Sequence, residues 1–255
     1  MQGYRVNSIR WPDEFRYALN GVAENFEKYA EASDDLRTIG LKGLSPQQTL
    51  AYDVFMLGTE ADEVLANLNT VMGDLERLGE DARAFHDRNP FDRFQLLLRL
   101  YFYEYGRFED VFGYFTNWMQ QRSLITKAER KAEREAFYNT FEYAIKTRNT
   151  MLHAATDWRG HCSAEIAILQ GLEAIGKSAI DASGKVLTWN DHIGPLCANT
   201  LPTLLAMGQH MQVFWNMQAA HLALALVDAG QLPKATKPYV GPHAADFLKA
   251  NTNYL

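Results

Sequence analysis

The chain has 255 residues, a length that allows one large domain or two small ones and a substantial buried core. Apolar residues make up 47% of it and charged residues 22%, which argues against wholesale disorder. The formal net charge of −6 argues against a protein that coats nucleic acid by bulk electrostatics, although a local basic patch could still bind a few phosphates.

The first half of the chain has the apolar spacing of helices. Residues 12–32 keep a helical stripe, and Pro12 suits the opening turn. A second, long helix is predicted from Ser45 to Gly79, because its first four residues, Ser-Pro-Gln-Gln, combine a serine cap, a first-turn proline and a glutamine three residues on. The remaining segments read as loop or short turns: residues 33–44 and 80–88.

The helix predicted from Pro90 to about Gln121 is rich in aromatic side chains. Nine of its residues mark an inner face: Phe91, Phe94, Leu97, Leu98, Tyr101, Phe108, Phe112, Phe115 and Met119. Glu104 lies close to that face, where a carboxylate is expected to be paired. A short connection suggests antiparallel packing on the next helix, so Arg148 is a candidate partner, and Arg107 or Arg99 is the local alternative.

Three tyrosines in this helix, at positions 101, 103 and 105, have two interpretations. They could stack on nucleic-acid bases. The more common role of such residues is core packing.

The next helix begins at Thr126, which forms a capping-box pattern with Glu129. Five apolar residues at spacings of three and four predict its buried stripe: Phe137, Phe141, Ala144, Ile145 and Leu152. Arg148 falls to one side of this stripe, while Asn149 and His153 stack one turn apart on the other side. An arginine beside an apolar seam suits a phosphate ligand, and the alternative is a cation favoured at the end of a helix.

The last third contains two further helices in this interpretation. The first runs from Ser163 to about Ile180, with four residues inward: Ile166, Leu169, Leu172 and Ile175. A turn-rich link over residues 181–195, with a brief extended piece near 185–189, leads to a helix over residues 201–229. The tail after it is punctuated by proline and is expected to lie along the surface.

The pattern from Arg148 to His153 resembles the signature of HEPN domains, in which an arginine precedes a histidine by four to six residues. Here four residues separate the two, and Asn149 is the polar follower that the family favours. The resemblance covers about residues 89–180. It implies an all-α antiparallel bundle with a HEPN-like core inside a single helical domain, 1–255, and with flanking helices in two extensions: 1–88 and 181–255.

The resemblance also implies a homodimer in which two such motifs face each other across a cleft. Many family members are metal-independent ribonucleases of toxin, antiviral or RNA-processing systems, and others only bind. Arg148, Asn149 and His153 would then be the catalytic residues. Four other residues are weaker substrate-binding candidates: Glu104, Arg107, Trp158 and Arg159. Trp158 and Arg159 read equally well as a packed aromatic and a solvated cation.

Three functions follow from this reading. The first is an endoribonuclease that cleaves RNA by 2′-hydroxyl attack, with an antitoxin or regulatory protein as a further partner. The second is a non-catalytic module that binds nucleotide, RNA or protein. The third is a helical bundle that holds a small ligand, with Arg148 and His153 structural.

Metal and cofactor sites are not expected. Cys162 and Cys197 lack a zinc-binding spacing and read as reduced thiols of a cytoplasmic protein. The usual nucleotide-binding, metalloprotease, hydrolase and di-iron motifs are missing. The first fifteen residues have no apolar core that would indicate a signal or anchor, and the apolar stretch 201–227 carries too many polar residues for a membrane span.

Overall fold

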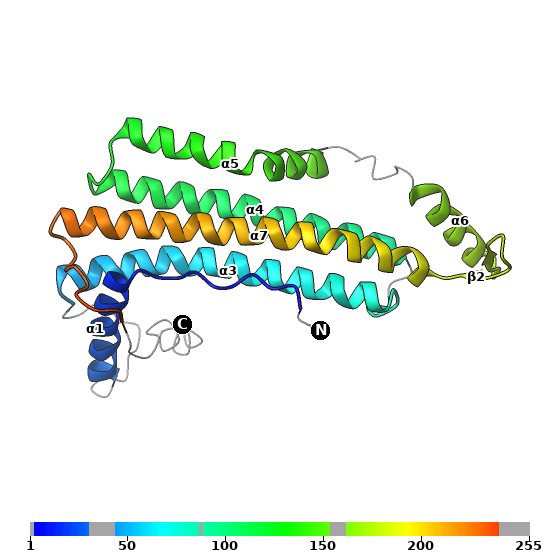
Figure 1. The fold of residues 1–255 in the computed structure, drawn as a ribbon, viewed down its shortest axis with the longest axis horizontal. Coiled ribbons are helices and arrows are strands. Elements are labelled where there is room, and N and C mark those ends of the chain that lie inside the picture. The colour runs from blue at the N-terminus through cyan, green and yellow to red at the C-terminus, as the bar shows by residue number, and fades with distance from the viewer. Residues whose placement is uncertain (1–2, 31–43, 87–88, 154–161, 240–255) are drawn as a thin grey trace. The chain divides into compact units, whose positions relative to one another are not determined.

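The computed structural model describes residues 3–30, 44–86, 89–153 and 162–239, without the side chains of residues 25–30, 150–153 and 162–165. Within these ranges the chain forms six α-helices and one two-stranded hairpin, which confirms the all-α prediction (Figure 1). The elements, in chain order, are α1 (Asp13–Ala30), α3 (Pro46–Glu80), α4 (Pro90–Gln121), α5 (Lys127–His153), α6 (Cys162–Ala174), β1 (Ala179–Ile180), β2 (Val186–Leu187) and α7 (Trp189–Asp228).

Contacts divide the chain into two compact units. Unit 1 comprises Met1–Ser8, Glu63–Thr116 and Lys127–Gln212, and unit 2 comprises Ile9–Asp62, Asn117–Thr126 and Val213–Leu255.

The predicted helix starts in the first half of the chain are confirmed. Helix α3 begins after a reciprocal capping box, in which the Ser45 amide donates to Gln48 Oε1 at 2.8 Å and the Gln48 amide donates to Ser45 Oγ at 3.2 Å. Helix α1 begins one residue after Pro12, and α4 has the predicted bounds. Most of the predicted loop 33–44 lies outside the described residues.

An aromatic cluster in the core of unit 1 lies where α4 meets α5. Phe112 and Phe137 stack with ring centroids 5.0 Å apart, and Phe108 contacts Phe141 edge to face at 5.9 Å. Tyr101 is fully buried and donates to the Leu204 carbonyl of α7 at 2.5 Å. The unit 1 portions of α3, α4 and α7 run side by side, and α5 lies along α4 (Figure 1).

The run of three tyrosines is split by the period of the helix. Tyr101 and Tyr105 are core residues, as the packing interpretation predicts, whereas Tyr103 is 57% exposed.

The prediction for α6 is wrong at its C-terminal end. The helix stops at Ala174, and Gly176 follows with a φ of +68°, a left-handed conformation that suits glycine and ends a helix. Ile166 and Leu169 are buried as predicted, but Ile175 is 65% exposed because it lies beyond the helix. Ala179–Ile180 then forms β1, which pairs antiparallel with β2.

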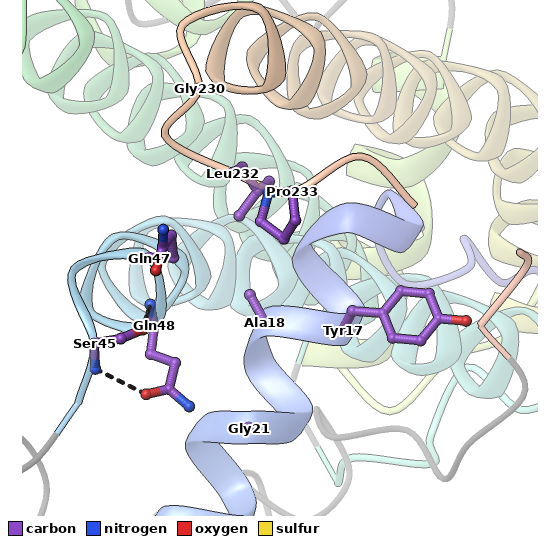
Figure 2. A pocket seen from close by; sticks show the side chains of 9 residues that line it. All are labelled: Tyr17, Ala18, Gly21, Ser45, Gln47, Gln48, Gly230, Leu232 and Pro233. Atoms are coloured by element: carbon purple, nitrogen blue, oxygen red, sulfur yellow. Dashed lines mark hydrogen bonds between the residues drawn. The ribbon is translucent and has the colours of Figure 1, made fainter. Parts of the chain in front are cut away.

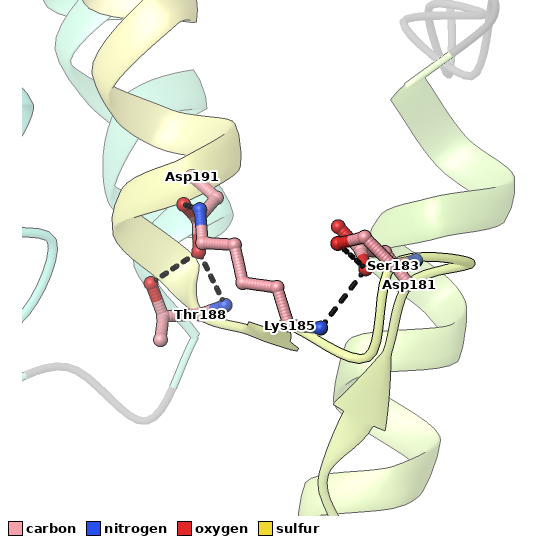
Figure 3. A network of polar contacts seen from close by, with 5 residues as sticks. All are labelled: Asp181, Ser183, Lys185, Thr188 and Asp191. Atoms are coloured by element: carbon pink, nitrogen blue, oxygen red, sulfur yellow. Dashed lines mark hydrogen bonds and ion pairs between the residues drawn. The ribbon is translucent and has the colours of Figure 1, made fainter.

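The start of α7 is also corrected, from residue 201 to Trp189. The Asp191 carboxylate reaches back to the helix start, where its Oδ2 accepts from the amide and the hydroxyl of Thr188 at 2.8 and 2.7 Å (Figure 3). Lys185 pairs with the other oxygen of the same carboxylate. Two prolines, Pro195 and Pro202, therefore lie inside the helix, where the sequence pattern places a break.

Tertiary contacts hold this first part of α7 in place. Trp189 is buried and donates to Glu173 Oε2 at 2.9 Å, and the Ala82 amide donates to Asn190 Oδ1 at 2.8 Å. Burial of Ile193 and Cys197 adds apolar contact. We infer that these contacts offset the cost of proline in the helix interior.

Unit 2 is built around α1. Phe15, which is fully buried, contacts Trp11 edge to face, and Trp11 also packs on Phe55 of α3. A Cβ at Gly58 would come within 2.2 Å of the Trp11 ring, so only glycine allows the indole this close to α3. The described tail reaches α1, where the Tyr239 hydroxyl donates to Asn20 Oδ1 at 2.9 Å.

Candidate functional site

The candidate site is centred on Arg148, near the C-terminal end of α5 in unit 1. Its Nη1 donates to Glu109 Oε2 of α4 at 3.1 Å, and its Nε and Nη2 donate to Asn149 Oδ1 at 3.3 and 3.1 Å. The side chains of Arg148 and Glu109 are 21% and 20% exposed, so the pair is partly accessible.

The guanidinium of Arg148 has more donors than its contacts with the described residues use. Arginine has five N–H donors, and the contacts to Glu109 and Asn149 use one on each of its three nitrogens. Among the described residues, one donor on Nη1 and one on Nη2 have no partner. Two such donors match two oxygens of a phosphate group.

Gly106 makes room for this arginine on α4. A Cβ at position 106 would lie 2.8 Å from Arg148 Nη1 and 3.6 Å from its Cδ. Gly106 and Glu109 are three residues apart, so they share one face of the helix. The guanidinium therefore lies across the backbone at Gly106 and reaches the carboxylate one turn further on.

Glu109 has a second partner on α5. The Tyr138 hydroxyl donates to Glu109 Oε1 at 2.5 Å. This hydrogen bond is the main cause that raises the pKa of Tyr138, with smaller contributions from burial and the charge of Glu109, and Arg134 acts in the opposite direction. Tyr138 thus stays a donor near neutral pH and holds one oxygen of the carboxylate while Arg148 holds the other.

The α4–α5 packing determines where these groups meet. Phe137 and Phe141 are buried against α4, and Phe141 has non-helical dihedrals, φ −109° and ψ 16°, within the continuous run of α5. Tyr138 lies before this irregularity and Arg148 after it, yet both reach Glu109.

The chain has no match among protein-family models, curated proteins or solved structures. The assignment of a function therefore depends on the residues of the site.

Of the other two predicted catalytic residues, the structure describes the side chain of only one, Asn149. Asn149 Oδ1 accepts from Nε and Nη2 of Arg148 and so helps to orient the guanidinium. His153 is the last residue of α5, but its side chain is not among those described. Two substrate-binding candidates, Trp158 and Arg159, lie outside the described residues.

Glu104 and Arg107 form a separate cluster, and the pairing of Glu104 with Arg148 is not what the structure shows. Arg107 Nη1 lies 3.5 Å from Glu104 Oε2, which is the local alternative, and Arg107 Nη2 lies 2.8 Å from Glu63 Oε2 of α3. The physical reason is helical phase, because positions 104 and 109 point about 140° apart around α4. Burial is the main cause that raises the pKa of Glu104.

Gly106, Glu109 and Tyr138 were not singled out by the sequence. The available signal was the i, i+3 spacing of a glycine and a glutamate in a helix otherwise filled with bulky side chains. That spacing becomes informative only once α5 is known to lie along this face.

Unit 2 contains a separate cavity of about 650 Å³ (Figure 2). Residues of α1, the start of α3 and the segment after α7 line it: Tyr17, Ala18, Gly21, Ser45, Gln47, Gln48, Gly230, Leu232 and Pro233. The amide of Gln48 faces this space with its oxygen held by the Ser45 amide (Figure 2). Its lining is mostly apolar with a polar edge formed by Ser45 and the two glutamines.

The described ranges contain neither a cluster of metal ligands nor a membrane-spanning helix. No three His, Cys, Asp or Glu side chains come together there as a group of metal ligands. None of the described helices combines the length and the apolar character needed to span a bilayer. Cys197 is buried, and this burial raises the pKa of its thiol to about 12.

Proposed function

We propose that this protein is a HEPN-like, metal-independent endoribonuclease in which Arg148 binds the scissile phosphate. The observation that carries the proposal is a pair of Nη donors that have no partner among the described residues, on a guanidinium that Glu109 and Asn149 already orient. Because the arginine is pre-positioned, a phosphate can bind without the cost of ordering a flexible side chain. The contact would stabilise the negative charge that develops when the 2′-hydroxyl attacks phosphorus.

His153 supplies the proton transfer in this proposal. It follows Arg148 by five residues in the same helix, which places the two backbones about 7.5 Å apart along the helix axis. An imidazole with an ordinary pKa of about 6.5 exchanges protons near neutrality. The reaction needs a base for the 2′-hydroxyl and an acid for the leaving 5′-oxygen, so His153 of a second subunit would complete the site in a homodimer.

The test is cleavage of single-stranded RNA by purified protein in the presence of a chelator. We expect products that end in a cyclic phosphate, and no cleavage of the same strand with 2′-deoxyribose. Arg148→Ala should lower kcat about 10²- to 10³-fold, and His153→Ala about 10²- to 10⁴-fold. Arg122→Ala is the matched control, because Arg122 is also bound to a carboxylate, Asp53, but lies in unit 2.

Two results would contradict the proposal. Equal activity of wild type, Arg148→Ala and His153→Ala would show that the motif is not the catalytic site. Binding of RNA that depends on Arg148 without any cleavage would support the non-catalytic module instead.

Small-ligand binding in unit 2 is the second candidate function, and the cavity favours it. Its volume of about 650 Å³ is within the range of about 300–1,000 Å³ typical of small-ligand sites. None of its lining residues belongs to the Arg148 cluster, so this function would leave Arg148 structural.

A further inference from the structure

The carboxylate of Glu109 is the single negative charge that the described residues place against Arg148. Its Oε2 accepts from Arg148 Nη1, and its Oε1 accepts from Tyr138. The other oxygen bound to the guanidinium belongs to Asn149, which is neutral. Glu142 and Lys146 form an ion pair on α5. Both side chains are exposed, and their opposite charges balance each other.

This arrangement affects any anion that binds Arg148. A phosphate at the two Nη donors that lack a partner in the described part of the chain would share the guanidinium with a carboxylate that is already 3.1 Å from Nη1. The two anions repel each other, and the repulsion is only partly screened because the pair is about four-fifths buried. The attraction of Arg148 for phosphate is therefore weaker than that of an arginine with neutral neighbours.

We propose that Glu109 is an internal competitor that sets how tightly Arg148 holds a phosphate. The inference rests on the proposed function for the identity of the substrate, but it concerns anion affinity and not cleavage. Removal of the charge should tighten binding, and loss of the oriented contact should slow turnover. Glu109 thus acts through Arg148 as a positioning residue.

An ion pair that only joins α4 to α5 makes a different prediction. In that case Glu109→Gln would change stability but not the affinity of Arg148 for an anion. Glutamine removes the charge but keeps one oxygen that can accept from Arg148. Its amide NH2 replaces the oxygen that accepts from Tyr138, so the contact that orients Arg148 is weakened while the competing charge is lost.

The probe is a fluorescent single-stranded oligodeoxynucleotide, which lacks the 2′-hydroxyl and is not cleaved, and anisotropy measures its binding. We expect Glu109→Gln to bind it about five- to tenfold more tightly than wild type at low salt. The gain should vanish in Glu109→Gln/Arg148→Gln. Glu142→Gln, a control on the exposed face of α5, should change the affinity less than about twofold.

A shorter acid provides a second variant if Glu109→Gln fails to fold. Glu109→Asp retains the charge but withdraws it by one methylene, and we expect a gain in affinity of about twofold. In a cleavage assay, KM should fall in Glu109→Gln while kcat also falls, a split that a purely structural contact would not give.

The outcomes separate this inference from the proposed function. Unchanged or weaker binding in Glu109→Gln, no binding by either protein, or a gain that persists without Arg148 would overturn the role of Glu109. Tighter binding through Arg148 in a protein that does not cleave RNA would support that role and contradict the ribonuclease. Cleavage by the wild type with no gain in binding affinity in Glu109→Gln would support the ribonuclease and contradict the role of Glu109.

Discussion

Two arginines of unit 1, Arg107 and Arg148, are alike in burial but differ in the charges around them. Their side chains are 29% and 21% exposed, and each is bound to a glutamate of α4. Arg107 also contacts Glu63 of α3, so its cluster has two carboxylates for one cation. Arg148 has one carboxylate and a neutral amide.

This difference separates a structural cluster from a candidate phosphate site. An anion near Arg107 would meet a net negative group. An anion near Arg148 meets a balanced ion pair, in which two guanidinium donors have no partner among the residues that the structure describes. The charge balance around a cation, and not its burial, distinguishes the two. The proposed function therefore relies on Arg148 and does not need Glu104 or Arg107.

The largest expected effect comes from removal of the packing that holds α5 on α4. Phe137 is 2% exposed and stacks on Phe112, so Phe137→Ala should lower the free energy of unfolding by about 3–5 kcal/mol. Tyr143→Ala, on the same helix but 70% exposed, should change it by less than about 0.5 kcal/mol. Urea unfolding measures both, and a loss under about 1 kcal/mol for Phe137→Ala would contradict the packing described.

Two glycines of α4 test how Gly106 contributes to the Arg148 cluster. Alanine favours a helix over glycine by up to about 1 kcal/mol, and at Gly113 the added Cβ meets no atom within 4 Å, so Gly113→Ala should stabilise. Gly106→Ala should gain less, because its Cβ displaces the guanidinium of Arg148.

Thermal unfolding and the RNA assay together read out this pair of variants. Only Gly106→Ala should lower cleavage, and it should leave the contacts of Arg107 intact. Equal stabilisation and equal activity in the two variants would show that the position of Arg148 does not depend on Gly106.

The smallest effect concerns the pH dependence of the Arg107 cluster. Burial and the charge of Glu63 raise the pKa of Glu104 above 4.5, against the effect of Asn67 and Arg107. The folded protein then binds more protons at this group than the unfolded chain, so its contribution to stability falls as the pH rises from 4.5 through the raised pKa.

Glu104→Gln removes this titration. We expect the stability of the variant relative to wild type to increase with pH across that window, measured as the difference in Tm between about pH 4 and pH 7. A difference that is constant with pH, or that falls, would contradict the raised pKa.

The local pattern of the sequence determined most of the helices. The capping box at Ser45 and the proline at position 90 act within one turn, so they gave the starts of α3 and α4 without knowledge of the fold. The same locality explains the errors. The predicted helix continued to residue 180, past the turn at Gly176 that follows α6. Pro195 indicated a break in the sequence pattern, whereas in the structure the contacts of Trp189 with residues distant in the sequence hold the start of α7.

By itself the sequence determined an all-α chain with Arg148 and Asn149 at the end of a long helix, since periodicity and spacing are local properties. Only the tertiary structure decided the partner of Arg148. Glu104 and Glu109 are both glutamates on α4, and the choice between them depends on which face of α4 lies against α5 and on the absence of a side chain at Gly106. The charge balance that makes Arg148 a candidate phosphate site is therefore a consequence of packing between helices.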